Sequence, residues 1–223
     1  GVSGIKLVNS MLTGGISNTG VIAATALSGS AITSTGALTT LTNAVAGTVI
    51  GAVNGQMDVS NSGLIALQHY SGTNTVTGSH VNASISGNYV QAAAGTLQIG
   101  VTGTAGSGTT SGNFSILNAS GSATFAANSK LRVNLNQASA VSVGGTLAGV
   151  VTTAGSLTTN GFTITDNLAG INFTYSTTAG SLSLIATAST VNCGATVSGN
   201  QLGTCEVAIN NPNLYIDPTG KVG

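Results

Sequence analysis

Short runs of alternating aliphatic residues, each ended by glycine, asparagine or serine, recur along most of this chain. Between Gly95 and Ala188 they begin with Gly95–Val101 and end with Ser181–Ala186. Such runs are typical of strands. Aliphatic residues do not recur at the helical spacing of three, four and seven, and glycine and β-branched residues are poor helix formers. The chain is therefore predicted to be all-β, with very little helix.

One short pattern is repeated in the first 94 residues. Its copies are Ile16–Ile22, Val59–Ile65 and, in degenerate form, Ile32–Leu38. Alternate aliphatic residues face an interior, while Asn or Ser close to Gly supplies the left-handed backbone of a tight corner. A period near 20 residues is typical of coils that stack with parallel strands about 4.8 Å apart. The pattern predicts a right-handed parallel β-helix (β-solenoid) of about ten coils, with an antiparallel β-sandwich as the alternative.

The composition excludes several classes of partner. Charged residues make up 4% of the chain, hydrophobic residues 41%, and the net charge is zero. Nucleic acids and anionic membranes bind clustered cations, whereas Lys6, Lys130, Arg132 and Lys221 are scattered. No apolar run approaches the roughly 18 to 20 residues of a membrane-spanning helix. We therefore expect no nucleic-acid partner and no membrane insertion by this segment.

The two cysteines, Cys193 and Cys205, lie 12 positions apart in a segment rich in turn residues. No histidine or further cysteine is nearby to complete a metal site, which favours a disulfide that closes a short loop. Two independent thiols and a redox-active pair are the alternatives. A disulfide would indicate an oxidising compartment outside the cytoplasm.

The segment Ser86–Val101 resembles the start of the C-terminal passenger region of bacterial type V autotransporters, the pertactin-like part of their β-helix. Similar content and order follow in Gly121–Phe125, Asn134–Leu135, Gly145–Gly149, Thr165–Thr174 and Leu182–Ala186. The resemblance implies a right-handed β-helix that is exported through the outer membrane and displayed or shed, with last coils that help to nucleate folding. The membrane barrel of such proteins is absent from this chain, so we expect a passenger fragment, a processed product or a relative that reuses the coils.

Three regions are expected: stacked coils over residues 1–94, terminal autochaperone-like coils over 95–188, and a cap or assembly tail over 189–223. The tail contains the two cysteines and an apolar strand signal, Leu214, Tyr215 and Ile216. Because the end of a solenoid exposes unpaired strand edges, a cap or a partner is expected there.

The sequence predicts no enzyme, no metal site and no cofactor. Asp58, Asp166, Glu206 and Asp217 are far apart in the chain, so a pair of facing catalytic carboxylates is not expected. His69 and His80 fit neighbouring coils, but a metal site would need a third ligand. Asp166-Asn167 is interpreted as a corner with local side-chain hydrogen bonds.

Three functions remain. The first is a non-enzymatic stalk or adhesin at the bacterial cell surface or outside the cell, which contacts a host or surface ligand. The second is the subunit of an extracellular filament, in which solenoid ends or the tail pair head to tail between copies of the chain. The third, suggested by the threonine pairs in Thr75–Thr77 and Thr163–Thr165, is an ice-binding solenoid.

Cys193 and Cys205 are predicted to form a disulfide in secreted protein. Mass spectrometry of a digest prepared without reductant should find the two cysteine-containing peptides linked, and reduction should separate them. Two free thiols in the secreted protein would contradict the prediction.

Overall fold

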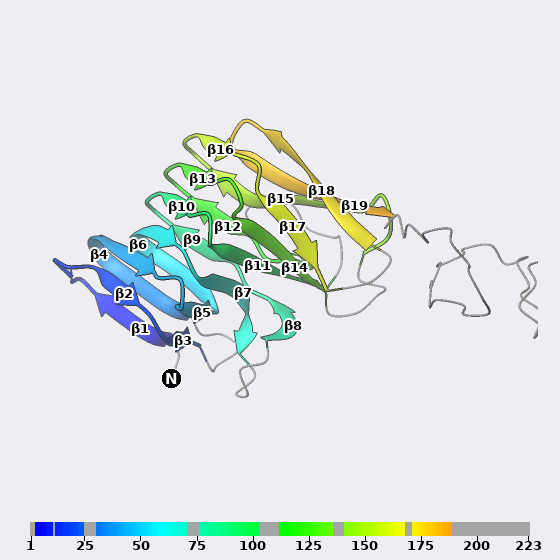
Figure 1. Ribbon diagram of the computed structural model, residues 1–223. Coiled ribbons are helices and arrows are strands. Elements are labelled where there is room, and N and C mark those ends of the chain that lie inside the picture. The colour runs from blue at the N-terminus through cyan, green and yellow to red at the C-terminus, as the bar shows by residue number, and fades with distance from the viewer. Residues whose placement is uncertain are drawn as a thin grey trace, which may run out of the picture.

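The computed structural model describes residues 3–10, 12–24, 30–70, 76–102, 112–135, 141–167 and 171–188 of the 223-residue chain. Within these ranges the protein consists of nineteen β-strands and has no helix, which confirms the all-β prediction. The described segments accordingly include no helix that is long and apolar enough to cross a membrane. Figure 1 shows the strands stacked along one axis, from β1 in blue to the last hairpin in gold.

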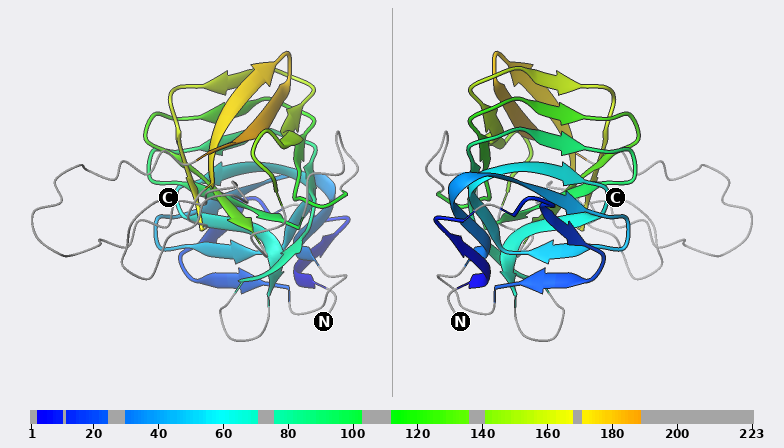
Figure 2. Two further views of the ribbon diagram at one scale, coloured as in Figure 1. Left: turned by 90° about the vertical axis from the view of Figure 1, so that its right-hand side faces the viewer. Right: turned by 90° about the vertical axis from the view of Figure 1, so that its left-hand side faces the viewer.

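The chain winds around three faces in turn, and successive windings pair through parallel ladders. The first face contains β1 (Ser3–Val8), the start of β4 (Ser30–Asn43), the start of β6 (Ala52–Asn61), β9 (Ala83–Ile85), β12 (Leu117–Ala119) and β15 (Thr146–Thr153). The second contains β2 (Ile16–Asn18), the ends of β4 and β6, β10 (Tyr89–Gln91), β13 (Ala123–Phe125) and β16 (Leu157–Thr159). The third contains β3 (Val21–Ala23), β5 (Thr48–Ile50), β7 (Leu64–Tyr70), β11 (Thr96–Val101), β14 (Lys130–Leu135) and β17 (Thr163–Asp166). The fold is therefore a β-solenoid and not a β-sandwich, and both views of Figure 2 show the windings stacked from blue to gold.

The register identifies which of the predicted repeat copies are equivalent. Asn18 pairs with Asn43, and Asn43 pairs with Asn61, so the copies that begin at residues 16 and 59 lie on the same face, two windings apart. Ile32 instead pairs with Ile5 and Val53 on the first face. The prediction that Ile32–Leu38 is a copy was therefore wrong. The true copy begins at residue 41, and its longer corner between Asn43 and the next glycine hid it.

The later windings are longer than the predicted 20 residues. Equivalent positions on the third face are Val21, Thr48, Leu64, Thr96, Lys130 and Thr163. From the third to the fifth winding, a longer connection, called an excursion below, joins the third-face strand to the next first-face strand. One excursion contains β8 (Val76–His80), which pairs antiparallel with β7. The described chain consequently makes six windings where about ten were expected.

Columns of inward-facing aliphatic side chains fill the interior. Ile65, Leu97 and Leu131 stand opposite one another on successive third-face strands and are at most 2% exposed. Burial of such a side chain contributes about 1.5–3 kcal/mol relative to exposure. Burial of the inward-facing side chains therefore supplies most of the driving force for folding. It requires each strand to keep its register, because a slip of one residue would turn these side chains outward.

The parallel stacking ends in a hairpin, β18 (Ile171–Thr178) and β19 (Ser181–Ala188), whose strands pair antiparallel. β19 also pairs antiparallel with β15, the last first-face strand. The last part of the region predicted as terminal coils, residues 171–188, is this hairpin. A two-residue connection between β18 and β19 forces an antiparallel return, since a parallel return needs a long crossover.

Leu184 in β19 is fully buried in the core. Replacing it by alanine is expected to lower the free energy of unfolding by about 2–5 kcal/mol, because the lost apolar burial adds to the cost of a cavity. Thr177→Ala, on an exposed position of β18, is the control and should change the value by about 0.5 kcal/mol or less. Urea unfolding followed by circular dichroism measures both. Equal effects of the two substitutions would show that the hairpin does not close the core.

Candidate functional site

The site residues predicted from the sequence lie outside the described residues. These are Cys193 and Cys205 of the expected disulfide and Leu214, Tyr215 and Ile216 of the expected assembly tail. Their pairing and their role remain predictions. The features with functional potential in the described part are the outer surface of the second face, the polar ladder behind it, a histidine pair and a groove at the last winding.

One column of outward-facing side chains runs along the second face in strict register. It consists of Ser17, Thr42, Ser60, Val90, Thr124 and Thr158. Every member is short and uncharged, and Val90 is 44% exposed. A parallel ladder places equivalent residues about 4.8 Å apart. The face is thus a regular surface of hydroxyl and methyl groups.

A ladder of buried amides stands directly behind this surface, at the corner between the second and third faces. Asn18 Nδ2 donates to Asn43 Oδ1 at 2.8 Å, and Asn43 Nδ2 donates to Asn61 Oδ1 at 2.9 Å. The three side chains are at most 5% exposed. Asn43 Nδ2 also lies 3.1 Å from the carbonyl oxygen of Leu64, and Asn61 Nδ2 lies 3.1 Å from that of Thr96. Each amide therefore joins its own winding to the next.

The amide ladder continues through Tyr89 to Gln91, whose Nε2 donates to the carbonyl oxygen of Lys130 in the next winding at 2.8 Å. Tyr89 joins the two amides. Its hydroxyl accepts from Asn61 Nδ2 at 3.4 Å and donates to Gln91 Oε1 at 2.5 Å. Complete burial raises the pKa of the Tyr89 hydroxyl far above its ordinary value, and the hydrogen bond from Asn61 opposes part of this shift. The hydroxyl therefore stays protonated and keeps its role as a donor.

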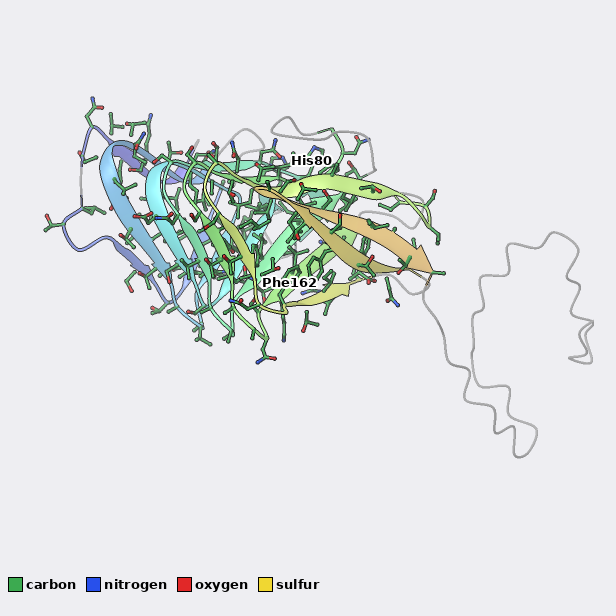
Figure 3. All side chains as sticks on the ribbon, turned by 90° about the horizontal axis from the view of Figure 1, so that it is seen from above. His80 and Phe162 are labelled. Carbon is green, nitrogen blue, oxygen red and sulfur yellow. The ribbon has the colours of Figure 1, made fainter. Side chains whose placement is uncertain are left out.

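An aromatic stack continues from Tyr89 to the end of the described solenoid. Ring centroids are 5.7 Å apart between Tyr89 and Phe125, 5.4 Å between Phe125 and Phe162, and 4.5 Å between Phe162 and Tyr175. Tilted pairs at such distances contribute about 0.5–1.5 kcal/mol beyond their area burial. Figure 3 labels Phe162 beside the final hairpin, where the stack leaves the core.

The stack ends in a groove of about 300 Å³ between β17 and β18. Phe162, Ile164, Phe173, Thr174 and Tyr175 line it. Tyr175 is 38% exposed, whereas Phe173 is 7% exposed. The groove is the open mouth of the hydrophobic core at this end, and its lining carries no charged side chain.

A second line of hydrogen bonds runs along the exposed corner between the first and second faces. Asp58 Oδ1 accepts from the backbone N of Asn88 at 2.7 Å, and Asn88 Oδ1 accepts from the backbone N of Ser122 at 2.9 Å. Ser122 Oγ then accepts from the backbone N of Ser156 at 3.1 Å. Asp58 therefore acts as a corner acceptor. The signal in the sequence was the Gly that precedes Asn88, Ser122 and Ser156.

The two histidines lie in one winding, His69 on β7 and His80 on β8 of its excursion, and not on neighbouring coils as expected. Register pairs His80 of β8 with Gln68 of β7, next to His69. His80 Nδ1 lies 3.5 Å from Thr102 Oγ1. Burial lowers the pKa of both imidazoles. For His80 the charge of His69 lowers the pKa further, and a hydrogen bond to the Gly112 backbone raises it. Both rings are accordingly neutral near pH 7.

The remaining polar candidates are dispersed. Asp58 lies on β6 and Asp166 on β17, on different faces and windings. Across the segments that the structure describes, no three His, Cys, Asp or Glu residues gather to hold a metal ion. Asn167 bonds across to another winding. Its Oδ1 and Nδ2 bond the backbone N and O of Leu135 in the preceding winding, at 2.7 and 3.0 Å.

The threonine pair that suggested ice binding does not continue along the third face. Thr163 pairs with Lys130, and Thr165 pairs with Arg132. The charged side chains on the preceding strand therefore interrupt a hydroxyl surface at this face. Thr75, in the other pair, lies outside the described residues.

No family model, curated protein or solved structure matches this chain.

Asn43 is expected to be the residue on which the polar ladder depends most. Asn43→Ala removes the partner of both Asn18 and Asn61, so buried amide groups lose hydrogen bonds at about 1–3 kcal/mol per group. We expect the free energy of unfolding to fall by at least about 2 kcal/mol. Thr42→Ala, the exposed neighbour on the same strand, should change it by about 0.5 kcal/mol or less.

Chemical unfolding of both variants, followed by circular dichroism, measures the difference. Near-wild-type stability of Asn43→Ala would contradict a role for the amide ladder in holding the windings together.

Proposed function

We propose that this protein is a non-enzymatic structural protein of the cell exterior, a β-solenoid stalk or adhesin of the autotransporter passenger type. The observation that carries the proposal is the second face. Six windings present short, uncharged side chains there in a single register. Such a face makes many weak contacts with a flat surface, and none of its side chains is a nucleophile activated by a neighbouring base.

The rod-like core supports the same proposal. Buried amides and stacked rings join each winding to the next, so the solenoid resists bending between windings. A stalk that holds a contact surface at a fixed distance from the cell needs this resistance to bending. The resemblance of Ser86–Val101 to autotransporter passengers supports export, and the predicted disulfide between Cys193 and Cys205 supports an oxidising location.

Head-to-tail assembly into a filament is a second candidate function. β16 and β17 each pair with only one strand among the described residues, β13 and β14 respectively. Their outer edges present backbone groups on which a further strand can pair. The antiparallel hairpin on the first face limits this stacking to two of the three faces. Ordered fibres in electron micrographs of concentrated protein would favour the filament over the stalk.

Surface display is tested by adding a protease to intact cells of the producing organism and detecting the protein with antibodies. We expect loss of the protein while a cytoplasmic marker survives. Protection of the protein until the cells are lysed would overturn the proposal.

The contact face is tested by attachment of beads coated with purified protein to producer cells and to abiotic surfaces. Thr124→Lys places a charge in the middle of the second-face column and should reduce attachment. Ala94→Lys places the same charge on an exposed corner away from the column and should not. Equal attachment of all three proteins would remove the second face as the contact surface.

A further inference from the structure

The chain contains two Asn-Gly sequences, Asn54-Gly55 and Asn160-Gly161. The fold constrains the first by hydrogen bonds and leaves the second exposed. Asparagine followed by glycine is chemically labile, because the backbone nitrogen of the next residue can reach the side-chain amide carbon. Glycine, having no Cβ, leaves this nitrogen unhindered and the backbone free to bend. Whether the reaction occurs in a folded protein depends on how firmly both groups are held.

The side chain of Asn160 is free to react. Asn160 is exposed, in the corner between β16 and β17. Its backbone N donates to the carbonyl oxygen of Phe125 at 3.0 Å, whereas its side chain makes no hydrogen bond with the described residues. Gly161 is exposed with φ +82°, no heavy atom lies within 4 Å of its Cβ position, and its backbone N donates no hydrogen bond within the same part of the chain.

Asn54 is held on both sides. Its Nδ2 donates to Ser30 Oγ at 2.9 Å, and its Oδ1 accepts from the backbone N of Ser84 at 2.8 Å. Gly55 lies within β6, paired with Ser34 and Ile85 of the adjacent windings. Attack of the Gly55 backbone nitrogen on the side-chain amide carbon of Asn54 would break two side-chain hydrogen bonds and distort the strand pairing. The fold therefore protects Asn54 from this reaction.

We propose that Asn160 is a site of spontaneous deamidation in the folded protein. The backbone nitrogen of Gly161, after losing its proton to solvent base, forms a bond to the side-chain amide carbon of Asn160. The bond from that carbon to the amide nitrogen breaks, and the nitrogen leaves as ammonia. Water then opens the resulting succinimide at either carbonyl, which yields aspartate or isoaspartate.

The modification changes the end of the solenoid. It adds one negative charge to a chain whose net charge is zero. The carboxylate arises two residues before Phe162, which stacks between Phe125 and Tyr175. Isoaspartate also lengthens the backbone by one methylene in the corner between β16 and β17. The product therefore differs from the new protein in charge and in the packing of its last winding.

The test follows purified full-length protein during incubation at neutral and at mildly alkaline pH. Anion-exchange chromatography should resolve an acidic form that accumulates faster at the higher pH. Peptide mass spectrometry with electron-transfer fragmentation should place aspartate and isoaspartate at Asn160 and leave Asn54 unchanged. Incubation in heavy-oxygen water should label the new carboxyl group.

Two controls make the outcome decisive. In denaturant both Asn-Gly sequences should convert, which shows that the fold alone protects Asn54. Asn160→Gln keeps the amide but needs a larger, slower ring closure, so the acidic form should be lost. Deamidation at Asn54 equal to that at Asn160 in folded protein, an unchanged Asn160, or an acidic form that maps elsewhere would overturn the proposal.

Discussion

A buried amide without hydrogen-bond partners costs about 1–3 kcal/mol, and in this protein the pairing of three buried asparagines fixes how the first windings sit on one another. Asn18, Asn43 and Asn61 satisfy one another through side-chain bonds that cross from winding to winding. A slip of one residue would turn an amide outward and an outer hydroxyl inward, since strand side chains alternate. Apolar columns alone tolerate small shifts more readily than a chain of hydrogen bonds does. The ladder therefore specifies the register as well as contributing to stability.

The interior changes its chemistry along the axis. The first three windings have asparagine side chains at the corner between the second and third faces, and from the fourth winding on aromatic rings stack beside Gln91 at that corner. Tyr89 belongs to both systems, because its hydroxyl bonds Asn61 and Gln91 while its ring packs on Phe125. A phenol is suited to this junction, having an apolar body and one polar end. The rings then reach the hairpin, where stacking of parallel strands on the first face stops.

The register of the buried side chains also determines which side chains align on the outer surface of the solenoid. The same register aligns the outward positions of the second face, so Ser, Thr and Val residues from six windings form one column. In such a column a repeated charge would face its own copies at about 4.8 Å. The scarcity of charged residues is thus a condition of this architecture. It also makes any charge that arises later, as at Asn160, a large change for the molecule.

The sequence by itself predicted a parallel β-solenoid with few charged residues, because alternation, corner glycines and composition are local properties. It also contained the copies at residues 16 and 59, whose corners have the same length. Only the tertiary structure decided which residues stack. The corner between Asn43 and Gly47 has two residues more than those after Asn18 and Asn61, and the excursions lengthen the later windings without disturbing their ladders. Stacking depends on hydrogen bonds and packing between windings. Insertions at corners leave these contacts intact, but they make the repeat length irregular, so the repeat cannot be recognised in the sequence. The antiparallel pairing of the last two strands could not be predicted from the sequence either, because a strand has the same alternation whether its neighbour runs parallel or antiparallel.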